Sequence, residues 1–440
     1  MTTEIAVINR LGIALAADSA VTIPGYGADK VFDTGDKLFE LSERYPVALM
    51  VNGSMDFLGV PWELVAKEFR CTPPAGAEKI SIADWMESFL AFVANHQAVK
   101  DDDVKRWLQH LIVETIEDLT ATVRERLEQA AEEDGDQNLQ SVLKALYSTT
   151  IIERIDDLEK KVVLKSLAGL GEDDLLPQIR SLLLEMEDLL PLDAGGEQHG
   201  LFARLVAQRL LKDLDRLPAT GLIVCGFGGK DLFPSLFAVE IDGYVAKRLR
   251  YRTSHNVTIA RGQETGNAIS FAQTDVVDRL LKGTDSRFID GTRAFIRENV
   301  AQSLQRNFGR LKLRILKQDD TEISPSDIGS ILGELIASQF ESQFASTITQ
   351  EFEKKFKETI ALMPKQDLIE LAEALVSITA IERKASDDAG TVGGPIDVAL
   401  ITRSEGFVWI KRKHHFDAAL NPRFMWRRFS APAGKEEPSV

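Results

Sequence analysis

The chain begins MTTEIAVINRLGIALAADSA, residues 1–20, and this stretch decides the fold. Residues 5–8 and 13–17 are apolar runs of the kind found in buried β-strands. The four residues between them, Asn-Arg-Leu-Gly at 9–12, predict a two-residue loop that closes an antiparallel hairpin. The sequence therefore predicts a β-hairpin at the very start of the chain.

The register of this hairpin brings the first residues close to an acidic side chain. Counting back along the ladder pairs Thr3 with Asp18 and Thr2 with Ser19. Met1 is normally removed when the next residue is as small as threonine, which would leave Thr2 as a free N-terminal residue. Such a threonine carries a hydroxyl nucleophile and its own base, the α-amine. An unperturbed α-amine titrates at about pH 7.7–8.0, so it can accept the hydroxyl proton under cellular conditions.

A second hairpin is predicted from strands at 37–41 and 47–51, joined by a Ser-Glu-Arg-Tyr-Pro turn. Its register places Lys37 opposite Val51, beside Asn52-Gly53. Two hairpins thus bring a threonine, an aspartate, a lysine and a glycine turn to strand ends that can adjoin.

These motifs resemble a known family. Thr2-Thr3, the run GIALAAD at 12–18 and Lys37-Leu38-Phe39 are similar to proteasome β subunits and the bacterial HslV peptidase, which are N-terminal nucleophile (Ntn) hydrolases. Further segments match in the same order, at 52–56, 221–228, 236–250, 393–402 and 406–408. The resemblance implies an α+β protein, a four-layer αββα Ntn-hydrolase sandwich of antiparallel sheets with large helical insertions.

The resemblance also implies catalytic roles. Thr2 is expected to attack a peptide carbonyl, with its own amine accepting the proton. Lys37 is a second cation that would lower the pKa of that amine, and Asp18 would keep the lysine charged and oriented. Backbone N–H groups at Asn52 and Gly53 are the expected oxyanion hole.

Supporting catalytic residues depart from the family pattern. The family has an aspartate and a serine just before the Gly-Gly that matches Gly393-Gly394. An ungapped match puts Ala389 and Val392 there, whereas a shift by one residue brings in Asp388 and Thr391. Asp388 and Thr391 are therefore the predicted supporting residues.

The substrate pocket is predicted by resemblance alone. Met50 would line it together with Val21 and Gly35, which favours medium-sized apolar substrate side chains. A methionine in the hydrophobic core is the alternative interpretation of Met50.

The pattern of elements predicts a core that is split by two helical blocks. A helix is expected to begin near Ser54, and apolar residues at helical spacing follow from residue 82 to about 214. The predicted parts are an Ntn core at 2–74, a helical insertion at 75–215, core at 216–304, a second insertion at 305–365, core at 366–430 and a loose tail at 431–440.

Composition excludes several classes of protein. The 440 residues carry 68 acidic against 52 basic side chains, a net charge of −16, which argues against nucleic acid or an anionic membrane as partner. With only Cys71 and Cys225 and no visible signal peptide, a reducing cytoplasm is the expected location. No apolar run approaches the ~20 residues of a membrane span. None of the six histidines has metal-ligand spacing, and we expect neither metal nor cofactor.

The sequence therefore predicts a threonine-type peptidase acting within a self-compartmentalised homo-oligomer, a ring or related assembly. Peptides or unfolded proteins are the expected substrates. An ATPase unfoldase is a possible partner, because the chain has no ATPase motif of its own. Two alternatives stay open: a non-proteolytic Ntn amidase or acylase acting on small amides, and a catalytically silent, proteasome-like scaffold subunit.

Overall fold

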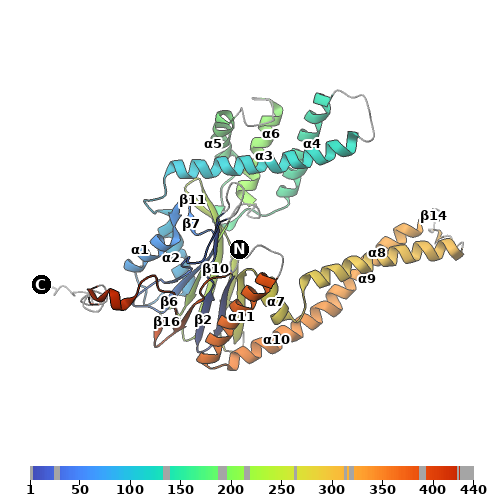
Figure 1. Ribbon diagram of the computed structural model, residues 1–440. Helices are drawn as coiled ribbons and strands as arrows, with labels where there is room; N and C mark the ends of the chain where they lie inside the picture. The colour runs from blue at the N-terminus through green and yellow to red at the C-terminus, as the bar shows by residue number, and fades with distance from the viewer. Residues whose placement is uncertain are drawn as a thin grey trace.

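The computed structural model describes residues 3–23, 30–131, 139–186, 196–212, 219–261, 265–311, 315–316, 322–385, 393–423 and 426. Two five-stranded antiparallel sheets form its centre, with helices around them (Figure 1). The first sheet has the order β12-β1-β2-β15-β16, with bounds Gly266–Ala272, Thr3–Asn9, Gly12–Ala17, Asp397–Thr402 and Gly406–Lys411. The second has the order β11-β10-β9-β6-β5, with bounds Arg248–Thr258, Ser235–Val245, Thr220–Gly226, Val47–Gly53 and Leu38–Glu40. The α+β class expected from the sequence is confirmed.

The N-terminal hairpin has the register that its turn predicts. Asn9 pairs with Gly12, and the ladder runs to the pair Glu4 and Ala17. One step further, the Asp18 N–H donates to the Thr3 carbonyl at 3.2 Å. Strand β1 therefore begins directly beside Asp18.

Side-chain alternation along the strands divides the core into layers. Ala6 and Ile8 of β1 face the second sheet and pack with Met50 of β6 in a cluster between the two sheets. Ile5 and Val7 face the opposite way, where the helices α7 (Asp275–Lys282), α10 (Ser346–Leu362) and α11 (Lys365–Ala385) cover them. The outer face of the second sheet packs in the same way against α1 (Trp62–Cys71) and α2 (Ile82–Ala94). Both sheets are thus covered on both faces over most of their central strands.

A block of helices follows α2 and has an apolar cluster of its own. It contains α3 (Asp101–Ala131), α4 (Leu139–Glu159), the short η1 (Lys165–Leu167), α5 (Glu172–Glu185) and α6 (Glu197–Lys212). Arg250 of β11 anchors the block, because its buried guanidinium donates to the Leu210 carbonyl at 2.9 Å and to Asp242 at 3.0 Å. The block therefore sits on the β10–β11 end of the second sheet.

A two-helix arm projects from the other side of the molecule (Figure 1). Its helices are α8 (Ser286–Leu311) and α9 (Pro325–Gln339), with the short strands β13 (Ile315–Leu316) and β14 (Glu322–Ile323) at the far end. A π-helical segment, Phe340–Ala345, joins α9 to α10. The arm is therefore continuous with a helix that packs on the first sheet.

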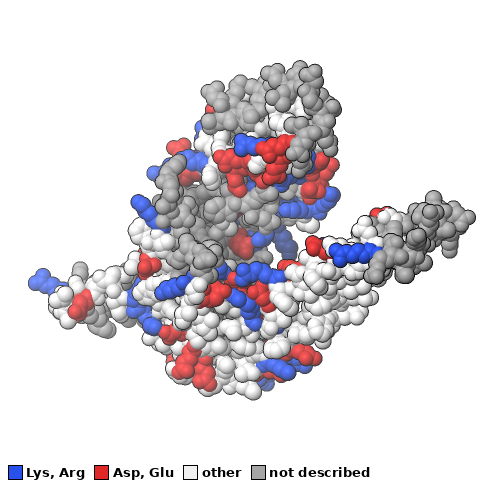
Figure 2. All heavy atoms as spheres, turned by 45° about the vertical axis from the view of Figure 1, so that its right-hand side comes forward, with Lys and Arg blue, Asp and Glu red and all other residues white. Residues whose placement is uncertain are grey.

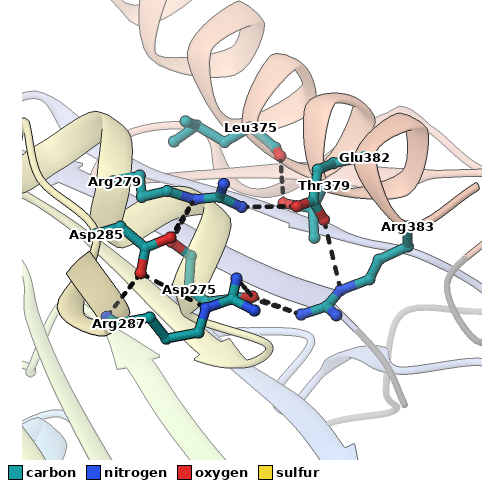
Figure 3. Close-up of polar contacts among 8 residues, drawn as sticks. All are labelled: Asp275, Arg279, Asp285, Arg287, Leu375, Thr379, Glu382 and Arg383. Carbon is teal, nitrogen blue, oxygen red and sulfur yellow. Dashed lines mark hydrogen bonds and ion pairs between the residues drawn. The ribbon is translucent and has the colours of Figure 1, made fainter. Parts of the chain in front are cut away.

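Ion pairs fix the root of the arm to α11 (Figure 3). Asp275 at the start of α7 accepts from Arg383 of α11 at 2.7 Å. Arg279 of α7 donates to Glu382 at 2.7 Å, and Arg287 of α8 reaches Asp275 at 3.5 Å. The network links three helices at the point where the arm leaves the body.

Small elements complete the described residues. They are β3 (Val21–Ile23) with β4 (Lys30–Phe32), β7 (Asp56–Phe57) with β8 (Val60–Pro61), and η4 (Ala418–Leu420). The helix expected near Ser54 starts instead at Trp62, because the intervening residues form the β7–β8 hairpin. No helix in the described ranges is both long and apolar enough to cross a membrane.

Candidate active site

Asp18 is the centre of a buried polar cluster where β1 and β2 end. Its Oδ1 accepts the Thr3 N–H at 3.0 Å, and its Oδ2 accepts the Gly393 N–H at 3.1 Å. The side chain is 1% exposed. Residues from the start, the hairpin and the far end of the chain thus meet on one carboxylate.

Lys37 joins this cluster from the second sheet, one residue before β5. Its Nζ lies 2.5 Å from Asp18 Oδ1 and 3.1 Å from Glu4 Oε1. The exposed fractions of the Lys37 and Glu4 side chains are both 0%. The register predicted for the second hairpin is confirmed, since the Val51 N–H donates to the Lys37 carbonyl at 2.9 Å. The structure therefore brings together Asp18 and Lys37, two of the three predicted catalytic residues.

Glu4 is the member of the cluster that the sequence analysis missed. It lies on the inward face of β1, the face that carries Ala6 and Ile8, and so points toward the second sheet. A single acidic residue in an otherwise apolar strand was the available signal, because an unpaired carboxylate is too costly to bury.

Thr2, the third predicted catalytic residue, lies outside the described residues. Its neighbour Thr3 is fully buried, and within the described part of the chain the Thr3 hydroxyl has no hydrogen-bond partner. The N–H of Thr3 is held on Asp18, so the peptide link to Thr2 lies at the cluster.

The predicted oxyanion residues end strand β6. Amide directions alternate along a strand, and the Val51 N–H points to β5 while the Ser54 N–H points to the carbonyl of Ala219. The Gly53 N–H therefore points to the β5 side, beyond the first residue of β5, and the Asn52 N–H points toward β9. Gly53 has φ = +76°, and a Cβ at this position would lie 2.2 Å from the Ala219 carbonyl oxygen, so only glycine fits.

The predicted pocket residues occupy two different environments. Met50 is fully buried between the sheets. Val21 and Gly35 are in contact with each other, since a Cβ on Gly35 would lie 2.3 Å from Val21 Cγ2. The Gly35 N–H also donates to the Ser19 carbonyl at 2.9 Å, next to Asp18.

The C-terminal motif meets the N-terminal hairpin at this site. Besides the Gly393 N–H on Asp18, the Ser19 hydroxyl donates to the Pro395 carbonyl at 2.6 Å. The predicted supporting residues Asp388 and Thr391 lie outside the described residues. Among the residues that are described, no group of three or more His, Cys, Asp or Glu side chains could hold a metal ion.

Solved structures similar to this chain exist, whereas the other comparisons found no match. No family model matches the chain, and no curated protein matches it. Anbu (ancestral beta-subunit) from Yersinia bercovieri is similar at 10% sequence identity and a TM-score of 0.25, over 99% of each chain.

The family membership suggested by the N-terminal motifs is wrong, since no family model matches the chain and the similar structure shares only 10% sequence identity with it. The physical reason lies in the motifs themselves. Short apolar strands around a tight turn, followed by an aspartate, satisfy any buried hairpin end, so they recur outside one family.

Proposed function

We propose that this protein is a hydrolase whose nucleophile is the Thr2 hydroxyl, made available when everything before Thr2 is removed, and that it cleaves peptide bonds. The observation that carries the proposal is the buried contact of Lys37 Nζ with Asp18 Oδ1 at 2.5 Å, on the carboxylate that also holds the Thr3 N–H. A buried lysine paired in this way is costly to maintain and typical of a functional site.

The covalent link to Thr3 supports Thr2 as the nucleophile. Consecutive Cα atoms are about 3.8 Å apart, and the N–H of Thr3, the next residue, is held on Asp18. A free Thr2 would carry its hydroxyl and its amine on the same residue, as a nucleophile with an adjacent general base requires.

The reaction then follows from the groups present. The Thr2 oxygen forms a bond to the substrate carbonyl carbon while the amine takes the hydroxyl proton. That proton passes to the departing amine as the C–N bond breaks, which leaves an ester on Thr2. Water attacks the ester, releases the acid and regenerates the hydroxyl. The positive charge of Lys37 favours the neutral, basic form of the amine, and Asp18 fixes the position of Lys37.

Gly53 is the proposed oxyanion donor. Its N–H points to the β5 side at a level where no described strand continues the ladder. One such donor is typically worth about 3–4 kcal/mol in the transition state. The same free strand edge can pair with an extended backbone, which favours a peptide as substrate over a small amide.

Cys225 is a poor alternative nucleophile. It is fully buried between the sheets, and this burial raises the pKa of its thiol. A thiol that stays protonated at neutral pH does not attack carbonyls efficiently.

The layering supports the proposed fold. Two facing sheets with helices on their outer faces fit an αββα sandwich of the Ntn type. The separate apolar cluster of α3–α6 supports a helical insertion inside the predicted 75–215, but α2, at the start of that range, packs on the second sheet and belongs to the core. The predicted insertion at 305–365 differs in the same way: α10 packs on the first sheet, and the arm begins with α8, inside the predicted core at 216–304. The core parts at 2–74 and 366–430 and the tail at 431–440 are proposed unchanged.

Exposed apolar side chains support the proposed homo-oligomer. On the arm, Phe288, Phe295 and Ile331 are 68%, 64% and 68% exposed. Large exposed apolar side chains that gather on one element mark protein interaction surfaces. Much of the arm seen in Figure 2 carries neither acidic nor basic side chains.

Intact-mass analysis with a β-lactone tests the proposed nucleophile. We expect loss of the residues before Thr2 and one covalent adduct, absent from Thr2→Ala. Thr3→Val is the matched control, because it removes the neighbouring hydroxyl, which has no partner among the described residues, at nearly constant volume. This variant should label like the wild type.

The outcomes separate the candidate functions. Labelling together with cleavage of unfolded protein supports the peptidase. Labelling with turnover of small amides only would move the assignment to an amidase or acylase. A chain that keeps the residues before Thr2 and takes no label contradicts both and favours a scaffold subunit.

A further inference from the structure

We propose that Glu4 is a positioning residue of this site, whose carboxylate holds Lys37 and raises the pH at which the Thr2 amine becomes an effective base. This inference rests on the function proposed above. It adds a further acidic residue to a site for which the sequence predicted Asp18 and, in a supporting role, Asp388.

The Glu4 side chain is fully buried and reaches Lys37. Its exposed fraction is 0%, and its Oε1 lies 3.1 Å from Lys37 Nζ. Strand β1 continues inward with Ala6 and Ile8, both buried between the sheets. A carboxylate at the end of this apolar face carries a large desolvation cost that an apolar side chain would avoid.

Pairing of Lys37 alone does not explain a second carboxylate. Asp18 already lies 2.5 Å from Lys37 Nζ and also holds two backbone N–H groups. One ammonium and one carboxylate already balance each other, so a second carboxylate adds negative charge to the cluster. The presence of Glu4 at this position is therefore better explained by tuning of the site than by stability.

Glu4 is only two residues from Thr2 along the chain. A step of two residues separates Cα atoms by about 7 Å at most. A negative charge near an amine favours its protonated form, the opposite of the effect of Lys37.

The other charged groups near Lys37 come from neighbouring elements. Asp18 follows β2, and Asp397 begins β15 on the far side of β2. Asp36 precedes Lys37, and Lys413 pairs with both Asp36, at 3.0 Å, and Asp397. None of these groups is substituted in Glu4→Gln, so a shift in pH dependence reports on Glu4.

The rate of β-lactone labelling of Thr2 between pH 5 and 9 tests the proposal. In Glu4→Gln, which keeps the shape and removes the charge, the acid limb of the profile should move to lower pH by about one unit. Glu405→Gln is the matched control, since Glu405 also pairs with a lysine, Lys365 at 2.8 Å, but at the β15–β16 turn. Its profile should coincide with that of the wild type.

A Glu4→Gln profile that coincides with the Glu405→Gln profile would overturn the inference while leaving the nucleophile intact. Absence of labelling in the wild type overturns the proposed function, and this inference with it. If Glu4→Gln does not fold, Glu4→Asp decides, because it keeps the charge and shortens the reach to Lys37. We expect Glu4→Asp to keep the acid limb of the wild-type profile and to label Thr2 more slowly at every pH. An unchanged labelling rate in Glu4→Asp would contradict a positioning role.

Discussion

At the scale of single residues, the most costly feature of this protein is the group of charged side chains buried between its sheets. Glu4, Asp18 and Lys37 are each at most 1% exposed. Removing one partner of such a group leaves an uncompensated charge, which typically costs about 3–5 kcal/mol. Substitutions there change stability as well as activity, so each labelling test needs an unfolding measurement on the same variant.

Gly53→Ala should destabilise the protein and stop labelling of Thr2. The left-handed backbone conformation at φ = +76° alone costs a side chain about 1–2 kcal/mol. A Cβ only 2.2 Å from the Ala219 carbonyl oxygen adds the cost of displacing β9, about 1–3 kcal/mol. Urea unfolding measures the stability change, and β-lactone labelling measures the effect on the site.

Gly59→Ala is the matched control, because Gly59 has φ = +81° and no atom within 4 Å of the added Cβ. It should show the backbone cost alone and label normally. Equal destabilisation by the two variants would contradict the steric role of Ala219.

The positions of two of the three buried charged side chains can be predicted from the sequence. Hairpin registers place Asp18 beside Thr3 and Lys37 opposite Val51, because antiparallel pairing from a tight turn fixes every later pair. Glu4 does not follow, since its partner comes from the other sheet. Contacts between sheets depend on how the sheets stack, which no local pattern encodes.

At the scale of elements, strands with a clear turn are predictable and helix starts are less so. Ser54 to Asp56 looks like a helix cap, yet α1 starts at Trp62. Leu58 at φ = 51° and Gly59 form a tight turn between β7 and β8, and the Gly59 N–H donates to Asp56 Oδ1 at 3.2 Å. A serine and an aspartate stabilise a turn and a helix cap equally well, so these two residues do not tell the two structures apart. The positive φ of Leu58 is what identifies the turn.

Ser81→Ala should destabilise α2 by about 1 kcal/mol, because it removes a capping box. The Ser81 hydroxyl accepts the Asp84 N–H at 3.3 Å, and Asp84 accepts the Ser81 N–H at 2.7 Å. The hydrogen bonds from Ser81 lower the pKa of Asp84. The carboxylate therefore stabilises the fold above its ordinary pKa and loses that contribution as the pH falls through the lowered value.

Urea unfolding at neutral and acidic pH measures this effect, and the difference from the wild type should shrink in acid. Ser377→Ala, inside α11, is the control: its hydroxyl bonds back to the Glu373 carbonyl at 2.9 Å, so stability should stay within about 0.5 kcal/mol. Equal losses in the two variants would contradict the capping role.

At the scale of the whole molecule, the arm is the part whose large apolar side chains are not covered by other elements of the described structure. Its two helices pack on each other, and the ion pairs of Figure 3 hold only its root. A sequence can predict such helices from periodicity, but not which face remains exposed, because that depends on every other element.

Replacing Phe288, Phe295 and Ile331 with serine should yield a smaller assembly in sedimentation velocity. The folded chain should keep its melting temperature, because exposed positions contribute little to stability. Val162→Ser and Leu420→Ser, at positions 86% and 80% exposed away from the arm, are controls that should keep the wild-type assembly. An unchanged sedimentation coefficient in the triple variant would exclude the arm as the contact surface.

The meeting of Gly393 with Asp18 also sets when the site can form during synthesis. Strand β1 pairs with β12, and β2 pairs with β15, whose first residue is Asp397. At about 5–20 residues per second, the ribosome needs roughly 20–80 s to make the chain between β2 and β15. Throughout that interval the growing polypeptide lacks the strand that closes the sheet beside Asp18. A nascent or prematurely terminated chain therefore cannot complete the Asp18 cluster, and under the proposed function it cannot cleave its neighbours.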